Sequence, residues 1–503
     1  MAIAGPAPRS LARGARRPGV PPARGRRGHA STPVPTAREL HLLNRFGWGF
    51  SASSFAQLRR AGGAVHWFAQ QLDPASVQES SRAEALDSWF PALQEEPAVV
   101  WRRHHDGCRR ATDHARDLSN RTLLRRIYST RSVLESLTDL WSNHLHVEST
   151  SIPAFTQRAA YDDVVRAHAL GRFDDLLVAT ALHPAMLLYL DGWGSPAREA
   201  HEHHARALLE LHTVGAGPTT PAAVREAARL LSGHTVVPTT WTATFDAGSA
   251  DRGPVEVLGF RHQGGEPDPE TARAFLRHLA RLPATARRVA HRIAVRFVSD
   301  TPSGHLVDRL AAVYLANGTD VRPVLRALPD EDEFWGSAGR KVRTPADDVV
   351  ATCRALGVRA EAPTGPRSFA HELSWSLGSI PVHQWPRPDG APDTAGSWGS
   401  ANRTPSSWRL HWGRAGDAHP DGRVRFLEPT DFLPRRRLRF DVFVDHLSRR
   451  LLGRPATEAL VAEACRSCGV TPDDVVTRHH PAVRTEFHDL VAVLLDSPAH
   501  TTR

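Results

Sequence analysis

The stretch TARELHLLNRFGWGFSASSFAQLRRAGG, residues 36–63, indicates two successive helices. Its apolar residues recur at three- and four-residue spacing, which is the period of an amphipathic helix. Gly47-Trp48-Gly49 interrupts this pattern and Gly62-Gly63 ends it. Ser51 or Ser53 would cap the second helix. We therefore expect helices on both sides of the Gly-Trp-Gly turn.

The same period continues along the chain and predicts a mainly α protein. Strong helical patterns recur near residues 121–142, 159–170, 173–181, 221–232, 270–281, 284–298, 304–316, 345–356, 437–452, 456–466 and 483–496. No internal repeat of fixed length interrupts them. This continuity favours one large multi-helix domain over residues 38–503.

Two segments depart from the helical period. Residues 234–260 alternate apolar and polar residues between turn residues, which predicts a small β-hairpin excursion. Residues 383–422 are rich in Trp, Pro and Gly, and they are too long for an ordinary connection. We expect this segment to be an ordered loop packed on the helical body, because its tryptophans would otherwise expose a large apolar area.

The positive charge of the chain is concentrated in its first residues. The 503-residue sequence has a formal net charge of +9, and residues 1–38 contain eight arginines and no acidic residue, so the remainder carries 9 − 8 = +1. We interpret residues 1–37 as a disordered Arg/Pro-rich tail or a translation start placed too early, with a basic arm that touches polyanions as the alternative. A nearly neutral body gives no reason to expect sequence-specific nucleic-acid binding.

Composition also limits compartment and redox chemistry. No run approaches 18 consecutive apolar residues, so no transmembrane segment is expected. The paired arginines near residue 16 are followed by Pro and Gly rather than by an apolar segment, so no secretory signal is visible and a cytoplasmic location is expected. Four cysteines, with a single Cys465-Arg-Ser-Cys468 pair, indicate ordinary thiols.

Several stretches, read in order, resemble a bacterial family called domain of unknown function 1800. LLNRFGWGFS resembles its opening motif, and LTDLWSNHLHV its tryptophan-histidine motif, with Trp141, Asn143 and His144 in place. The resemblance covers about residues 38–503 and continues through RAHALGRFDDLLVATALHPAMLLYLD, ARALLELHTVG, VREAARLLSG, LPATARRVAHRIAVRFVSD, RTPADDVVATCRALG and LVAVLLDSPAHTTR.

The resemblance implies a mostly helical protein, and it implies little chemistry. Its members are often exported, and they are often encoded beside members of domain of unknown function 1501, which resemble sulfatases or phosphatases. A product of such a neighbouring gene is therefore the implied partner. Polar motif positions differ here: His201-Glu202-His203 stands where Asn-Glu-Asn is usual, and Ser379 where glutamine is usual. These differences put any shared chemistry in doubt.

The histidine-rich stretch HEHHARALLELHTVG, residues 201–215, is the candidate site in the sequence. Ser195-Pro196 and Gly215 suit the start and end of one helix of about four turns. Arg206 lies four residues from both Glu202 and Glu210, which predicts a Glu–Arg–Glu ladder. Leucines at 208, 209 and 211 leave only a narrow polar stripe, so we expect the ladder to be buried.

A divalent metal is a possible cofactor at this stretch. Glu199 and His203 have workable ligand spacing but supply only two ligands, so further ligands such as His144 or His146 would be needed. Twenty-eight histidines make chance pairing common. A structural network or a pocket wall are the alternatives.

The sequence leaves two functional hypotheses open. The first is an accessory or binding scaffold with a polar ligand pocket formed by His144, Asp191, Glu202, His203, Arg206 and Glu210. The second is a hydrolase of glycan or ester bonds, metal-assisted or not, in which Asp191, Glu210 and His144 are the candidate catalytic residues. Sequence motifs of serine hydrolases, P-loop proteins and dinucleotide-binding proteins are absent.

Overall fold

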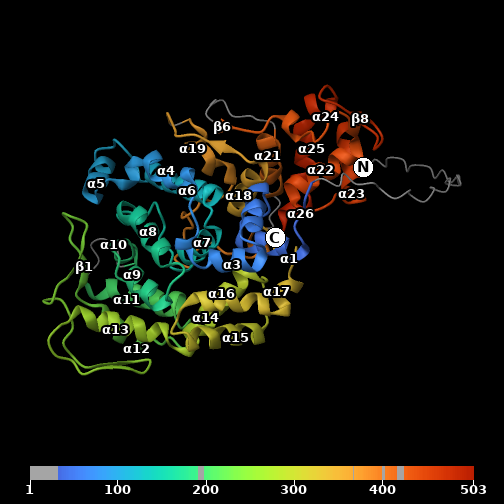
Figure 1. Ribbon diagram of the computed structural model, residues 1–503. Helices are drawn as coiled ribbons and strands as arrows, with labels where there is room; N and C mark the ends of the chain where they lie inside the picture. Colours follow the sequence, from blue (N-terminus) through green and yellow to red (C-terminus); the bar gives the residue numbers. More distant parts are fainter. Residues whose placement is uncertain (1–31, 191–196, 366, 399–402, 416–423) are drawn as a thin grey trace, which may run out of the picture.

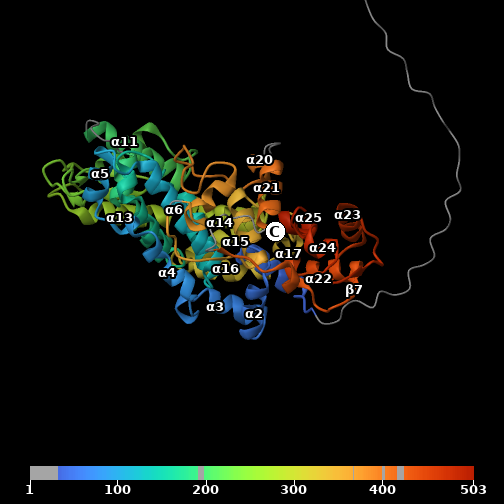
Figure 2. The ribbon, with the colours of Figure 1, turned by 90° about the horizontal axis from the view of Figure 1, so that it is seen from above.

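The computed structural model describes residues 32–190, 197–365, 367–398, 403–415 and 424–503. Helices dominate these residues, as predicted, and the strands among them form only short antiparallel pairs. Figures 1 and 2 show a chain that is broad in both views, with α22–α25 at one end and α11 and α13 at the other. The predicted tail falls largely outside the described residues, but Thr32 already contacts His446.

The first half of the chain contributes helices to the middle and to one end of the molecule. They are α1 (Ala37–Phe46), α2 (Ala52–Arg60), α3 (Ala64–Gln71), α4 (Ser81–Trp89), α5 (Pro97–His105), α6 (Ala111–Tyr128), α7 (Ser132–His144), α8 (Arg158–His168), α9 (Phe173–Ala181), α10 (Pro184–Leu190), α11 (Ala197–Ala207), α12 (Pro221–Leu231) and α13 (Pro269–Ala280).

The second half returns through the middle to the opposite end. Its helices are α14 (Pro283–Phe297), α15 (Gly304–Ala316), α16 (Val321–Ala327), α17 (Asp332–Gly336), α18 (Pro345–Leu356), α19 (Phe369–Glu372), α20 (Ala395–Trp398), α21 (Arg403–Ala415), α22 (Phe440–Leu452), α23 (Glu458–Cys468), α24 (Pro481–Arg484), α25 (Phe487–Leu495) and α26 (Pro498–Thr501). Short 3-10 turns join several of them, at Pro74–Ser76, Pro91–Gln94, Ala154–Gln157, Leu328–Asp330, Leu373–Leu377 and Pro429–Phe432.

Local sequence signals explain the helix boundaries. Thr36 caps α1 in a capping box with Glu39, and Ser51 caps α2, as the opening stretch predicted. The continuous helical pattern over residues 121–142 predicts one helix, but the structure has two there. Ser129 takes an extended conformation and separates α6 from α7. The pattern near 483–496 likewise divides into α24 and α25.

The predicted hairpin near 234–260 is two small hairpins. The strand β1 (His234–Val236) pairs with β2 (Ala243–Phe245), and β3 (Val255–Val257) pairs with β4 (Phe260–His262). The two other pairs are β5 (Arg359–Ala360) with β6 (Val424–Arg425), and β7 (Leu438–Arg439) with β8 (Val475–Val476). All four pairs are too short to shape the core.

Two large hydrophobic clusters and one small one make up the core of the described residues. The first large cluster collects side chains from α1–α3 and α7–α17, and the second from α4, α6, α8, α18, α19 and α21–α25. The small one joins Val100, Ala111 and Phe155. The boundary between the two large clusters runs through the middle of the molecule, where α6, α7, α14 and α18 meet (Figure 1). Within the described residues no single helix meets the length and hydropathy of a membrane span; α9 and α10 do so only as a pair, bent by 63°.

Of the segment predicted as a Trp-rich loop, residues 383–422, the stretches 399–402 and 416–422 lie outside the described residues, and the remainder is only partly a loop. Residues 383–394 are irregular, whereas α20 and α21 follow. The irregular part contacts the body closely: Gly390 has φ +73°, and a Cβ there would lie 1.8 Å from the carbonyl oxygen of Asn143. Trp408 and Trp412 on α21 are 54% and 51% exposed, so these two tryptophans do not pack inside as expected.

We expect Gly390→Ala to destabilise the protein by about 1–3 kcal/mol, because the new methyl group meets backbone and the left-handed conformation is strained. Urea unfolding would measure the change. Gly396→Ala is the matched control, since a Cβ there meets nothing within 4 Å and alanine favours the helix α20. Equal stabilities of the two variants would contradict the close contact.

Candidate functional site

A buried arginine joins the elements that meet at the boundary between the two clusters. Arg296, on α14, is 3% exposed. Its guanidinium lies 3.3 Å from Asp139 of α7, 3.4 Å from Asp347 of α18 and 3.4 Å from Asp393 of the irregular segment. Those three carboxylates raise the pKa of Arg296 above its ordinary value despite burial, which favours the charged form.

The same carboxylates have further cationic partners. Arg126 donates to Asp139 at 2.5 Å, Arg503 lies 3.1 Å from Asp347 and 2.9 Å from Asp393, and Lys341 lies 3.5 Å from Asp393. Trp48 packs between two of these cations, with the guanidinium carbons of Arg126 and Arg296 each 5.0 Å from its ring. The network is thus paired throughout, as buried charges require.

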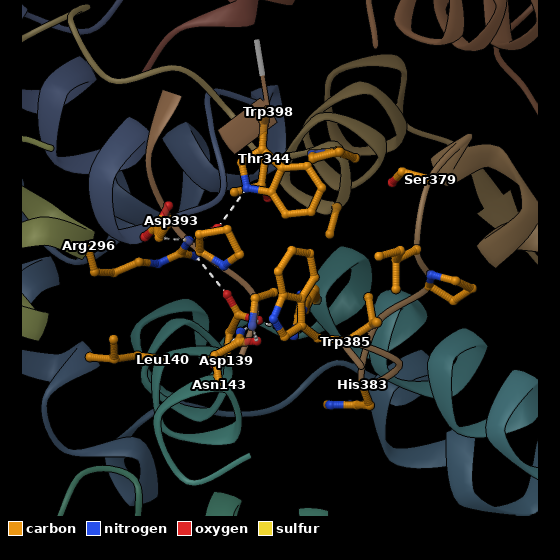
Figure 3. Close-up of a pocket in the computed structure, with 18 of the residues that line it drawn as sticks. Asp139, Leu140, Asn143, Arg296, Thr344, Ser379, His383, Trp385, Asp393 and Trp398 are labelled. Carbon is orange, nitrogen blue, oxygen red and sulfur yellow. Dashed lines mark hydrogen bonds and ion pairs between the residues drawn. The ribbon is translucent and has the colours of Figure 1, made fainter. Parts of the chain in front are cut away.

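A pocket opens beside this network. Its empty space is about 800 Å³ when the open space at its mouth is included. Its lining residues come from α6, α7, α14, the start of α18 and residues 379–398. Figure 3 shows Trp385 and Trp398 facing one another across the pocket, with Arg296, Asp393 and Asp139 on one side and Ser379 on the other.

Trp385 and Trp398 form one wall of the pocket, which we call the tryptophan wall. Residues at and just after the end of α7 hold this segment in place by hydrogen bonds. His146 donates from Nε2 to the carbonyl oxygen of Trp385 at 2.8 Å, and the Asn143 side chain accepts from the amide of Ala391 at 3.2 Å. The Trp398 indole donates to the carbonyl oxygen of Pro392 at 2.6 Å. The ring centroids of the two tryptophans are 6.1 Å apart, an edge-to-face arrangement.

One cation of the pocket differs from the others. Arg292 lines it one helical turn before Arg296, and no ion pair joins it to a carboxylate of the described residues. Its Nε atom is buried and has no hydrogen-bond partner in that part of the chain. Burial lowers the pKa of Arg292 and Arg288 adds to this shift, because the carboxylates of Asp393 and Asp389 compensate the lost hydration only in part. A half-buried guanidinium whose buried Nε has no partner favours an anionic ligand.

The histidines predicted for the site are buried beside the pocket rather than in it. His144 donates from Nε2 to the carbonyl oxygen of His212 at 2.9 Å, and His146 donates to Trp385. Burial lowers the pKa of both side chains, so both are neutral near pH 7. They position backbone, and neither belongs to a three-residue ligand set within the described residues.

The predicted Glu–Arg–Glu ladder is on the surface, contrary to expectation. Arg206 pairs with Glu210 at 3.1 Å, with side chains 47% and 29% exposed. His203 is exposed and Glu202 is half-buried. His204 and His212 are buried and occupy part of the inward face of the helix. The polar residues of this helix therefore extend over more of its circumference than the leucines alone indicated. The last turn, Leu208–His212, is a π-helix that ends before Gly215.

Four further predicted residues lie wholly or in part outside the described residues. Asp191 lies outside the described residues, as do Ser195 and Pro196, and so does the side chain of Glu199. The histidine-rich helix still reaches the pocket helix indirectly. Arg288, one turn before Arg292 on α14, donates to the carbonyl oxygen of Leu211 at 2.8 Å.

The sequence interpretation missed the pocket residues although the signal was present. Arg288, Arg292 and Arg296 follow one another at four-residue spacing in LPATARRVAHRIAVRFVSD, which places them on one helix face. The stretches that carry Asp139, Asp347 and Arg503 were all among those quoted for the family resemblance. Their convergence could not be read from spacing, because they lie far apart in the chain.

The comparison with protein families matches residues 41–502 to the description Protein of unknown function (DUF1800). The chain belongs to this family. No curated protein and no solved structure matches it.

Replacing Arg296 should cost far more stability than replacing Arg206. Arg296→Met leaves Asp139, Asp347 and Asp393 short of a partner in the interior, and we expect a loss of about 3–5 kcal/mol. Arg206→Met removes an exposed pair worth about 0–1 kcal/mol. Urea unfolding of both variants checks this; similar losses would show that the network is not buried in solution.

Lowering the pH should destabilise the protein even at pH values too high for most carboxylates to be protonated. Burial lowers the pKa of His146 to about 4 and those of His204 and His212 to about 3, whereas an unfolded histidine titrates near about 6.5. Between pH 6.5 and 4 the unfolded chain therefore binds more protons, so the unfolding free energy falls as pH falls. His411, with a pKa raised to about 9, acts in the opposite direction, because its stabilisation is complete only below the unfolded pKa of about 6.5; most of that gain lies above pH 7, so it offsets only a small part of the loss.

Urea unfolding at pH 7 and pH 5 measures the effect. The wild type should lose stability at pH 5, and His146→Gln should lose less, because glutamine does not titrate. A pH-independent unfolding free energy would contradict the assignment of neutral buried histidines.

Proposed function

We propose that this protein is a binding scaffold whose pocket holds a small anionic ligand with a flat apolar face, and that an acidic sugar is the class that fits best. The observation that carries the proposal is Arg292. It is a half-buried cation at a pocket wall, with a buried Nε atom and no carboxylate in ion-pair contact among the described residues.

The rest of the lining supports this ligand class. Trp385 and Trp398 offer aromatic surface for an apolar face, and Asn143, Asp139 and Asp393 offer polar groups at the pocket base. Aromatic surface with a few convergent polar groups is typical of small-molecule sites. Ser379 replaces the glutamine implied by the resemblance, and its shorter side chain leaves more room at the opposite wall.

Binding is favoured over hydrolysis by the state of the pocket carboxylates. Asp139 pairs with Arg126 and Arg296, and Asp393 pairs with Arg296, Arg503 and Lys341. Neither is free to exchange a proton with a ligand. The hydrolase hypothesis, the DUF1501 partner and the cytoplasmic location stay predictions.

Calorimetric titration of the full chain with glucuronate, glucose 6-phosphate and glucose tests the proposal. The two anionic sugars should bind in preference to neutral glucose, and the better one identifies the anionic group. Arg292→Met should weaken that binding roughly tenfold to a hundredfold, the value of a hydrogen bond to a charged group. Arg292→Lys should recover part of it, because the charge remains but the fork is lost.

Arg287→Met is the matched control. Arg287 lies on the same helix but is 55% exposed and pairs with Asp308, so its loss should leave binding unchanged. Glucose binding as tightly as the anions, or Arg292→Met binding like the wild type, would overturn the proposal.

A further inference from the structure

A second polar cluster lies away from the pocket, between α18, α21 and the C-terminal helices. Asp348, His411 and His500 are all buried there, and one ligand atom of each lies within 4.8 Å of the others. Oδ1 of Asp348 is 3.1 Å from Nε2 of His411 and 3.7 Å from Nε2 of His500. Of the residues that the structure describes, no other three-residue group has this metal-ligand geometry.

We infer that Asp348, His411 and His500 form a binding site for a divalent transition metal, with Zn²⁺ as the best fit. Ligand bonds of 2.0–2.1 Å in a tetrahedral site place neighbouring ligand atoms about 3.3 Å apart, close to the two separations observed. Two imidazole nitrogens and one carboxylate oxygen are also the donor set that zinc takes.

The surroundings match those of a metal site. Nδ1 of His411 lies 2.5 Å from Oδ1 of Asp496, so a carboxylate orients this ring from behind, as is usual for metal-bound histidines. Ser407 donates to the other oxygen of Asp348 at 2.5 Å and fixes that carboxylate. Thr352, whose hydroxyl is 3.1 Å from Nε2 of His500, or a water would complete four ligands.

Local sequence spacing explains how the groups meet. Asp348 and Thr352 lie one turn apart on α18, and Ser407 and His411 one turn apart on α21. Asp496 and His500 stand on either side of the junction between α25 and α26. Asp496 is 27% exposed on its side chain, which gives the cluster a route to solvent. Arg343 holds the backbone of His500 by donating to its carbonyl oxygen at 2.6 Å.

Binding balances protons and charge. Without metal, Nε2 of His411 donates its proton in a hydrogen bond to Asp348. When the metal binds, this proton leaves to solvent and the nitrogen lone pair coordinates the metal. His500 binds through its neutral ring, whose pKa burial holds well below the ordinary value. Two carboxylates, Asp348 and Asp496, then neutralise the divalent charge. Metal uptake should therefore weaken as pH falls.

Metal analysis of the full-length protein tests the inference. After removal of metal by a chelator, Zn²⁺ titration should restore about one bound ion per chain, with a rise in melting temperature. Co²⁺ should give the visible absorption bands of a tetrahedral site, a readout that needs no variant. No uptake of either ion by the wild-type protein would overturn the inference.

Variants locate the ion. His411→Gln and His500→Gln should lose the bound metal, and Asp496→Asn should keep it with roughly 10–100-fold weaker affinity, as expected for an outer partner. His146→Gln is the control, because it removes a buried histidine at the location first considered for a metal. Retention by both ligand variants, or loss from His146→Gln instead, would overturn the assignment. Should a ligand variant fail to fold, the Co²⁺ spectrum and Asp496→Asn still decide.

Discussion

A single guanidinium determines how the middle of this protein is assembled. Arg296 requires three carboxylates because it is almost completely buried, and those carboxylates come from α7, α18 and the irregular segment after residue 383. An unpaired charge there would cost several kcal/mol, so each of these segments has one acceptable position. The position of the tryptophan wall, and with it the shape of the pocket, follows from that requirement.

The helical architecture could be predicted because its causes are local. Caps, period and breakers lie within a few residues of the helix ends that they set, as at Thr36 and Ser51. The break at Ser129 was missed because no glycine or proline marks it. The burial of Arg206 was predicted wrongly for a different reason: neutral histidines at 204 and 212 occupy part of the buried face, and a count of leucines cannot show this.

The candidate site was harder to predict because its causes are long-range. Four-residue spacing identifies Arg288, Arg292 and Arg296 as one face of α14. Which of them lacks a carboxylate depends on segments far away in the chain: Asp139 precedes Arg296 by 296 − 139 = 157 residues, and Arg503 follows it by 503 − 296 = 207. The same holds for Asp348 and His411. Composition drew attention to the histidine-rich helix, whereas the structure uses its histidines mainly to fill space and to hold backbone.

The division of the core has a consequence for how the chain can be cut. The two large hydrophobic clusters do not follow sequence order. The helices α1 and α7 belong to the first cluster, whereas Trp48, just after α1, and α6, just before α7, belong to the second. A cut after Phe334 would leave the first cluster whole but would divide the second, whose members run from Trp48 to Leu495. No single cleavage point therefore yields two fragments that each carry one complete cluster.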